Sequence, residues 1–572
     1  MKKKLPVYFF FLTVFSIAQI GINTTDPKGA LDVTAIDNTG LVLPRVASIE
    51  DVTDGNGNPP VDGTTVYDLS RNTTCFYQND RWLCIGLDAS GDPVLTDETI
   101  VSTFNNTSSI DYIKASNTDA GDVFGISISL SDDGNTMAVG SLREASNATG
   151  INGNQNDNSF QNGAVYVFVR TAGIWSQQAY IKTSTQGLVI DFGRSVSLSS
   201  DGNTLAIGTD QESNNATGIN GNENNGVASR SGAAYVFVRT GTTWSQQAYI
   251  KASNAEGNDR FGFSLNLSNN GNTLAVGAFG EASNATGING NQNDNSIQFS
   301  GAAYVFTRTG TTWTQEAYLK ASNPDNFDFF GVSASLSGDG NTLAVGANGE
   351  ASNSSGINGN QNDNSLTNSG AVYVFIKVAG VWSQQAYIKA SNLVGDGNYA
   401  RHISFSNNGD TMVVGSSGDG GVGSAYVFSR SGSTWTQEAR LQSSNIENQD
   451  HFGRLVSISE NGNVLAIGAS GEDSNATGIN GDQNNNSLEG SGAVYIFTRT
   501  GSTWTQQAYI KTTNPDIADG NDEIPLSLSG NGRTLAAGYL REASNATGIN
   551  GNQANDNANL SGAVYVYEAN SN

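Results

Sequence analysis

The chain has few of the residues on which enzymes and metal sites depend. Its 572 residues include 2 cysteines, 2 histidines, 3 methionines and 9 prolines, and only 14% are charged. A structural zinc site needs four ligands, usually cysteine and histidine, so this supply argues against one. The net charge of −25 comes with no basic patch, which argues against a nucleic-acid partner. After residue 18 no apolar run approaches the roughly 20 residues of a membrane-spanning helix.

Residues 1–18 have the pattern of a secretory signal peptide. Three lysines at positions 2–4 precede an apolar stretch at 7–15, and small residues at 16–18 form a cleavage site. The sequence therefore predicts a secreted protein, located outside the cell or at the cell surface. Its acidity then serves solubility in that compartment.

What the chain has in abundance is one repeated unit. Seven copies start at Phe124, Phe192, Phe261, Phe330, Tyr399, Phe452 and Asp522, with spacings of 68, 69, 69, 69, 53 and 70 residues. A fixed period of this kind predicts a repeat architecture in which each copy is one structural unit.

Each copy contains four short apolar runs separated by turn residues. In the third copy the runs are Phe261–Leu267, Thr273–Gly277, Gly301–Thr307 and Trp313–Lys320. β-Branched and aromatic residues fill them, and Asn-Gly or Thr-Gly turns join the first pair and the last pair. Such a sheet cannot bury both of its faces alone, whereas seven arranged around an axis can. The sequence thus predicts an all-β fold with a seven-bladed β-propeller of four-stranded antiparallel blades over residues 107–567.

The repeat also resembles a known family. Phe-Gly at its start, Leu-Ala-Val-Gly-Ala in its middle and Gly-Ala-Val-Tyr-Val-Phe in its third run resemble FG-GAP repeats, which build the integrin α-chain β-propeller and occur in many secreted bacterial proteins. The resemblance implies a seven-bladed propeller that serves as a binding or adhesion platform. The calcium loop of the family does not carry over, because the first hairpin, residues 131–136, is too short and too poor in carboxylates.

The last copy lacks its fourth run. It ends with Gly562–Tyr567, and the one unassigned copy of the outer-strand pattern is Ile110–Lys114. An unpaired apolar edge invites aggregation, so we expect the N-terminal strand to complete the last blade.

Residues 19–100 form a separate small β module in this interpretation. Cys75 and Cys84 flank Asn79-Asp80, a two-residue hairpin turn, and should face each other at a non-hydrogen-bonded position. Cα atoms there approach closely enough for a disulfide, and export favours oxidation. We therefore expect a Cys75–Cys84 disulfide.

Six copies carry a long insert between the second and third runs, close to Glu-Ala-Ser-Asn-Ala-Thr-Gly-Ile-Asn-Gly-Asn-Gln-Asn-Asp-Asn-Ser. Strand direction places all six on one face, beside the inter-blade loops. Their oxygen-rich side chains raise calcium as the one candidate cofactor. The competing interpretation is that Asn and Gly make turns bonded to the loop itself. The calcium candidates are Glu144, Asp157, Glu281, Asp294, Glu350, Asp363, Glu472, Asp482, Glu542 and Asp556.

Residues that break the sevenfold pattern are candidates for ligand binding. The two histidines, in copies five and six, have charged neighbours, which gives the set Arg401, His402, Asp450, His451 and Arg454. Such a cluster suits an acidic sugar or acid–base chemistry, and the competing interpretation is drift in degenerate repeats.

The sequence contains no catalytic motif, so we predict a binding protein and not an enzyme. It predicts a secreted binding or adhesion scaffold that presents Asn- and Gly-rich loops to an extracellular glycan or protein. The alternative is an enzyme that acts on extracellular polysaccharide through the cluster in copies five and six. A surface spacer with no ligand is a third interpretation.

Overall fold

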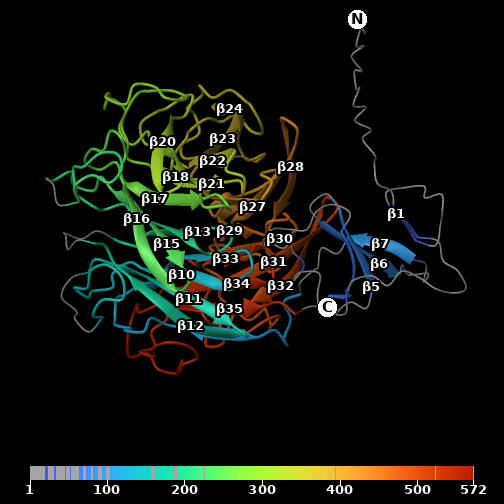
Figure 1. Cartoon of the computed structure of the whole chain (residues 1–572). Helices are drawn as coiled ribbons and strands as arrows, with labels where there is room; N and C mark the ends of the chain where they lie inside the picture. The colour runs from blue at the N-terminus through green and yellow to red at the C-terminus, as the bar shows by residue number, and fades with distance from the viewer. Residues whose placement is uncertain are drawn as a thin grey trace, which may run out of the picture. The chain divides into compact units, whose positions relative to one another are not determined.

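The computed structural model of the chain separates into two compact units, Met1–Ile100 and Val101–Asn572. It describes residues 103–570 apart from 156–160, 185–190, 224–225, 393 and 522, and in the first unit it describes residues 52 and 64 and the strands given below. The signal peptide expected at residues 1–18 lies outside this description. Figure 1 shows the second unit as sheets arranged around a centre.

The first unit is a small β module, as predicted. β1 (Ile20–Ile22) pairs in parallel with β2 (Leu31–Val33). A five-stranded sheet has the order β3-β4-β5-β6-β7, with bounds Arg45–Val46, Thr65–Asp68, Thr73–Gln78, Arg81–Leu87 and Pro93–Asp97. Cys75 of β5 lies opposite Cys84 of β6 in the antiparallel register, which confirms the predicted cross-strand pair. The side chain of Cys84 lies outside the description, so the disulfide stays a prediction.

The second unit consists of seven four-stranded antiparallel sheets, the blades of a β-propeller. Blades one to three comprise β9 (Phe124–Leu130), β10 (Thr136–Ser141), β11 (Ala164–Thr171) and β12 (Ile174–Ile181), then β13 (Ser195–Leu198), β14 (Thr204–Thr209), β15 (Ala233–Thr240) and β16 (Thr243–Ile250), then β17 (Phe261–Leu267), β18 (Thr273–Ala278), β19 (Ala302–Thr309) and β20 (Thr312–Leu319).

Blades four to six repeat this arrangement. They comprise β21 (Ser333–Leu336), β22 (Thr342–Ala347), β23 (Ala371–Val378) and β24 (Val381–Ile388), then β25 (Tyr399–Phe405), β26 (Thr411–Ser416), β27 (Ser424–Ser431) and β28 (Thr434–Leu441), then β29 (Phe452–Ile458), β30 (Val464–Ala469), β31 (Ala493–Thr500) and β32 (Thr503–Ile510). Blade seven comprises β33 (Leu526–Leu528), β34 (Thr534–Tyr539), β35 (Ala563–Glu568) and, from the other end of the propeller segment, β8 (Ile110–Ile113).

The middle strands of each blade are buried on both faces because neighbouring blades cover them. Every residue of β22 is buried, as are the first five residues of β23. One core cluster joins Val236 of blade two to Leu274, Tyr304 and Phe306 of blade three, and a similar cluster lies at each of the other blade contacts. Near-continuous apolar runs, unlike alternating ones, suit strands covered on both sides.

Sterics explain why glycine follows phenylalanine at the start of the repeat. Gly331 has φ of +91°, and a Cβ there would lie 2.2 Å from the carbonyl oxygen of Ala302 in the preceding blade. Across the same contact, a Cβ on Gly277 would lie 2.0 Å from the carbonyl oxygen of Gly331. The repeated glycines therefore let the start of one inner strand approach the backbone of the blade before it.

The ring closes as predicted. β35 pairs antiparallel with β8 and places Tyr565 opposite Tyr112, with ring centroids 5.2 Å apart. Lys114 then forms an ion pair of 2.7 Å with Glu542 of blade seven. The N-terminal strand thus supplies both the outer strand and a buried charge to the last blade.

At the end of the propeller that carries the tight turns, main-chain hydrogen bonds run from blade to blade around the axis. Each first turn donates an N–H to the carbonyl of the next blade: Asp132 to Ser200 (3.0 Å), Ser200 to Asn269 (2.9 Å), Asn269 to Gly338 (2.9 Å), Gly338 to Asn407 (2.7 Å), Asn407 to Glu460 (2.8 Å), Glu460 to Gly530 (2.9 Å) and Asn531 back to Asp132 (3.2 Å). We call this closed circle the turn ring.

Two carboxyl groups meet inside the turn ring. Burial raises the pKa of Glu460 to about 9, and the hydrogen bond to Asp132 and its charge add to the rise, while the amide of Asn269 opposes it. Both groups line a cavity of about 160 Å³ at this end of the axis. Glu460 therefore keeps its proton at neutral pH.

Stability should depend on pH through this pair. A pKa that is higher in the folded state favours folding at low pH, and the contribution is lost as pH rises from about 4.5 to about 9. Glu460→Gln keeps the neutral hydrogen-bonding form, so its melting temperature should match the wild type at pH 5 and exceed it at pH 9. The exposed Glu489→Gln is the control. If the difference in melting temperature between wild type and Glu460→Gln stayed constant from pH 5 to pH 9, Glu460 would not be the group whose raised pKa makes stability depend on pH.

Closure of the ring should govern stability. Deleting residues 105–114 removes β8 and leaves β35 with an unpaired apolar edge, so we expect a large fall in melting temperature. Deleting residues 19–100 leaves every blade intact and should change the melting temperature far less. Differential scanning calorimetry of both deletions measures this. An unchanged melting temperature after the shorter deletion would disprove closure by this strand.

Candidate functional site

The long inserts fold over the outer strands of their own blades, at the same end as the inter-blade loops. In blade three, Ile288 bridges to Leu319, and the N–H of Asn289 donates to the carbonyl of Tyr318 at 2.8 Å. Equivalent bridges recur in blades one, two, four, six and seven. Asn254, in the loop that enters blade three, donates to Glu281 at 3.1 Å, which ties loop and insert together. We call this end the insert face.

A buried ion pair anchors each insert. In blade three, Lys320 lies 2.8 Å from Glu281 and donates to Ser300 at 2.7 Å, while the Tyr318 hydroxyl donates to Glu281 at 2.9 Å. The same pair recurs as Glu144–Lys182 (2.6 Å), Glu212–Lys251 (2.7 Å), Glu350–Lys389 (2.5 Å), Glu472–Lys511 (2.9 Å) and Glu542–Lys114 (2.7 Å). Blade five, which has no long insert, uses Asp419 and Arg440 at 3.0 Å.

These pairs bear on the calcium candidates. Glu144, Glu281, Glu350, Glu472 and Glu542 each accept from a lysine, so their charge is already balanced. Three aspartates make turns within their inserts: Asp294 accepts from Ser296, Asp363 from Ser365 and Asp482 from Asn484. Asp157 lies outside the described residues, and Asp556 lies in the insert of blade seven. Among the residues that the structure describes, no three His, Cys, Asp or Glu side chains gather as a metal site would require. Calcium binding stays a prediction.

The mouth of the central channel opens on the insert face, and its lining differs from blade to blade. The residue after the Phe-Gly position is Ile126, Arg194, Phe263, Val332, Arg401 or Arg454 in blades one to six, and in blade seven, which lacks Phe-Gly, Glu523 lies at the mouth. With Arg454 excepted, these residues line a central cavity of about 220 Å³ together with His402. Three cations and one anion thus stand at a mouth whose scaffold is otherwise repeated.

Glu523 is the counter-charge at the mouth. It lies 3.0 Å from Arg401 and 3.7 Å from Arg454. Burial acts to raise its pKa, but the charges of His402, Arg194, Arg401 and Arg454 outweigh burial and hold the pKa at about 2. Burial also lowers the pKa of His402 to about 4, with the arginines adding to the fall and Glu523 opposing it. At neutral pH Glu523 is charged and His402 is not.

The structure divides the candidates named from sequence. Arg401, His402 and Arg454 come together around Glu523. Asp450 instead accepts from the N–H of Glu447 at 3.0 Å, the role that Asp122, Asp259, Asp328 and Asp519 have in their loops. Burial raises the pKa of Asp450 to about 7. His451 has φ of 56°, like Val123, Arg260 and Phe329 at the matching position. Asp450 is thus part of a repeated loop structure.

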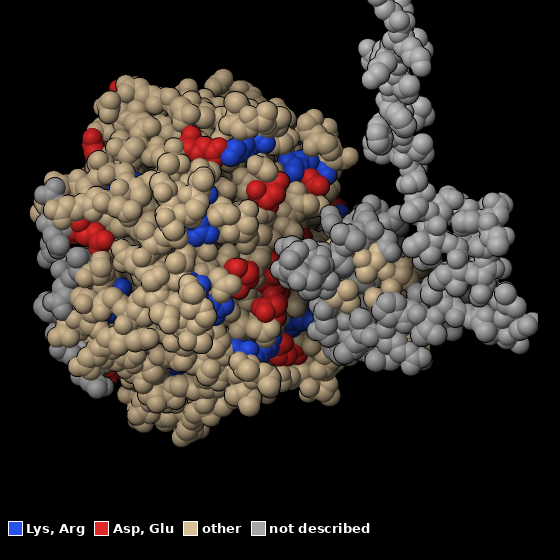
Figure 2. Space-filling model, in the orientation of Figure 1, with Lys and Arg blue, Asp and Glu red and all other residues tan. Residues whose placement is uncertain are grey.

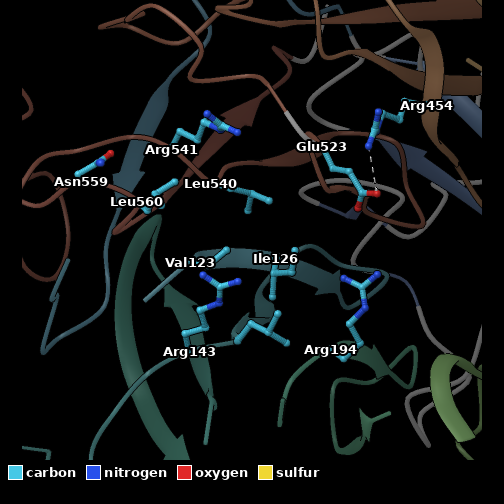
Figure 3. A pocket seen from close by; sticks show the side chains of 11 residues that line it. Val123, Ile126, Arg143, Arg194, Arg454, Glu523, Leu540, Arg541, Asn559 and Leu560 are labelled. Atoms are coloured by element: carbon cyan, nitrogen blue, oxygen red, sulfur yellow. Dashed lines mark ion pairs between the residues drawn. The ribbon is translucent and has the colours of Figure 1, made fainter. Parts of the chain in front are cut away.

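A second pocket, of about 390 Å³, adjoins the mouth. Arg143, Arg194, Arg454 and Arg541 line it with Glu523, Asn559 and the apolar side chains Val123, Ile126, Leu142, Leu540 and Leu560. We call it the arginine pocket, and Figure 3 shows Arg143 and Arg541 set apart from the Glu523–Arg454 pair. Figure 2 shows acidic and basic side chains on the propeller as small separate groups within a surface that is mostly uncharged.

Arg143 and Arg541 are not among the candidates predicted from the sequence. In blades three to six the matching residue is Gly280, Gly349, Gly418 or Gly471, and in blade two it is Gln211. Both arginines could be found by comparing the copies position by position, since they stand where four other copies have glycine.

Five phenylalanines cluster on the insert face of blades three and four. Phe263 and Phe279 lie 4.7 Å apart, Phe279 and Phe329 6.0 Å, and Phe299 and Phe327 5.7 Å between ring centroids. Phe327 is 49% exposed. Arg194 lies over the ring of Phe263 at 4.5 Å, so this aromatic cluster is continuous with the arginine pocket.

Comparison with known families supports this fold directly. The FG-GAP repeat family matches residues 244–306, 313–375 and 435–497. The propeller contains FG-GAP repeats. No curated protein matches it. Each matched segment starts at the tryptophan of one outer strand and ends in the third strand of the next blade, so the family unit spans a blade contact.

The tryptophan at the start of that unit secures the contact. Trp313 donates to Gln247 of the preceding blade at 2.9 Å, and Arg308 lies 5.3 Å from its ring. Trp244, Trp435 and Trp504 donate to the preceding blade in the same way, so these tryptophans serve packing between blades. Within the described residues, no helix has the length and apolar character to cross a membrane.

The anchoring pair should be structural. Glu281→Gln leaves Lys320 buried without its counter-charge, so we expect a loss of about 3–5 kcal/mol in the free energy of unfolding. The loss should be the same in EDTA and in millimolar calcium, because Lys320 supplies the cation. Chemical denaturation of wild type, Glu281→Gln and the exposed control Glu256→Gln measures it. If calcium raised the melting temperature of the wild type and Glu281→Gln abolished the rise, the glutamate would be a calcium ligand.

Proposed function

We propose that this FG-GAP propeller is a secreted binding or adhesion scaffold that takes an extracellular glycan or protein ligand on its insert face. The observation that carries the proposal is a contrast within the molecule. The buried core repeats from blade to blade, whereas the residues around the channel mouth do not.

The contrast is plain at matching positions. The tyrosine of each third strand is buried in all seven blades, for example Tyr304, Tyr373 and Tyr565. At the mouth, the position after Phe-Gly carries an isoleucine, a phenylalanine, a valine and three arginines in blades one to six, and blade seven, which lacks Phe-Gly, contributes a glutamate. Variation confined to the loop end of a rigid scaffold is the usual arrangement of a binding site.

The arginine pocket and the aromatic cluster make a surface fit for recognition. Guanidinium groups bind planar anions with two hydrogen bonds, and aromatic rings offer large rigid contact areas. The Asn- and Gly-rich inserts surround this surface and supply amide donors and acceptors. Secretion rests on the predicted signal peptide, and FG-GAP repeats are typical of extracellular proteins.

The mouth suits binding better than acid–base catalysis. A general acid or base works best with a pKa near the working pH. His402 at about 4 and Glu523 at about 2 are both far from neutrality. Around pH 7 neither exchanges a proton readily, so the alternative of a polysaccharide-acting enzyme draws no support from this pair.

The test compares two apolar-to-polar changes at opposite ends of the propeller. Phe327→Asn places the residue of Asn258, the matching position of the preceding blade, in the aromatic cluster. Ile174→Thr places the residue of Thr243 at a tight turn, where Ile174 is 73% exposed. Arrays of extracellular glycans and matrix proteins are probed with the full chain and with both variants.

We expect Phe327→Asn to weaken binding at least tenfold, the usual effect of removing an aromatic anchor. Ile174→Thr should bind within twofold of the wild type. Equal binding by all three proteins would place the ligand elsewhere, and no binding to any array component would favour the spacer interpretation.

A further inference from the structure

We infer that the arginine pocket binds the carboxylate or sulfate group of an acidic saccharide. This deepens the proposed function and rests on it. The inference comes from the charges, the unpaired donor and the apolar lining of one pocket.

The pocket has a surplus of positive charge. Four guanidinium groups and one carboxylate, Glu523, line it, and Arg401 contacts Glu523 from outside the pocket. In the described part of the chain, neither Arg143 nor Arg194 forms an ion pair, although both also line a neighbouring pocket of about 480 Å³. Two carboxylates line that neighbouring pocket: Asp191, which accepts from Gln211 and whose charge acts on Arg194 and Arg143, and Asp210, which pairs with Arg260 at 3.0 Å. The two pockets together have five lining arginines against three lining carboxylates among the described residues, so positive charge remains in surplus. In a protein of net charge −25, such a local surplus attracts an anion.

One donor in the pocket lacks an acceptor. The Nε of Arg454 is buried, and no acceptor among the described residues reaches it. A buried N–H without a partner costs free energy, and a ligand oxygen would remove that cost. Arg454 contacts Glu523 through Nη2, at 3.7 Å, so the acceptor that suits its Nε is an uncharged ligand oxygen such as a sugar hydroxyl.

The other side chains that line the pocket indicate which kind of molecule bears the anionic group. Val123, Ile126, Leu142, Leu540 and Leu560 are apolar, so the bound group must have a carbon face beside its charge. A volume of about 390 Å³ suits a small group and not a folded domain. A sugar ring that bears a carboxylate or sulfate has both parts, and the adjoining aromatic cluster offers flat apolar surface to the next sugar in a chain.

The position of Glu523 fixes the orientation. Its negative charge repels a second anion, so the ligand's anionic group belongs beside Arg143 and Arg541, which Figure 3 shows away from Glu523. Arg143 and Arg541 are therefore the residues on which affinity for the anion should depend most.

The repeats supply the variants for the test. Arg143→Gly and Arg541→Gly reproduce Gly280 and Gly471, and Arg143→Gln reproduces Gln211, so each introduces a residue with which another blade of this chain folds. Lys377→Gln removes one positive charge beside a tight turn and is the control. Unchanged melting temperatures confirm that each variant is folded.

Calorimetric titration of the full chain uses three matched probes: trigalacturonic acid, a sulfated galactose trisaccharide and a neutral galactose trisaccharide. We expect an acidic probe to bind at least tenfold more tightly than the neutral one. Each arginine change should lower that affinity about tenfold and the double change about a hundredfold, with Lys377→Gln unchanged. If trigalacturonic acid binds more tightly, the pocket prefers a carboxylate; if the sulfated trisaccharide binds more tightly, the pocket prefers a sulfate.

Three results would overturn the inference: equal affinity for acidic and neutral probes, full acidic-probe affinity in Arg143→Gly/Arg541→Gly, or tighter binding of a triglutamate peptide than of either acidic saccharide. The proposed function fails separately. If array binding persists and depends on Phe327 while the arginine variants behave as wild type, the scaffold binds a ligand but the arginine pocket does not hold its anion.

Discussion

The buried lysine–glutamate pair is the interaction on which the insert face depends. Each of six blades places an ammonium group between a carboxylate and its neighbours, as Lys320 does with Glu281 and Ser300. Removing two charges from water is costly, and their mutual attraction returns little more than that cost. The pair therefore adds little net stability. Its effect is positional, because either charge alone would be far worse, and this fixes each insert on its own outer strand.

That positional effect separates scaffold from site. Glu281 accepts from Lys320 and Tyr318 of its own blade and from Asn254 of the loop before it. The inserts are thus held down around the rim, which leaves the channel mouth to the residues after Phe-Gly. Because the rim is alike in six blades, chemistry at the mouth can vary without disturbing the fold.

The sequence predicted most of the fold because the fold is repeated. Seven copies of one pattern gave the blades, and the missing fourth run of the last copy identified Ile110–Lys114 as the closing segment, of which Ile110–Ile113 form β8. The alternating direction of the strands placed the inserts and the inter-blade loops at one end of the propeller. These inferences need only the residue pattern of short segments and the rule that strand edges must be covered. Both can be applied without knowing which distant side chains meet.

The site was harder to predict, because it depends on side chains from blades one, two, five, six and seven meeting in space. Arg401, His402 and Arg454 were found as exceptions near rare histidines, and Asp450 was included only for its place beside His451. Glu523 was overlooked because copy seven departs from the pattern there, and Ile524, 1% exposed, fills the core where other blades have phenylalanine. Rarity of a residue type was a weaker guide than variation among matching positions.

The closing strand has a consequence for the order in which the molecule is made. Tyr112 and Glu542, joined by a hydrogen bond of 2.8 Å, are 430 residues apart in the chain. β8 is among the first strands of the propeller to leave the ribosome, yet its partner β35 is the last. Pairing across so long a loop carries a high entropic cost and is slow. An exported chain would therefore cross the membrane with its ring open, and the propeller would form only on the far side.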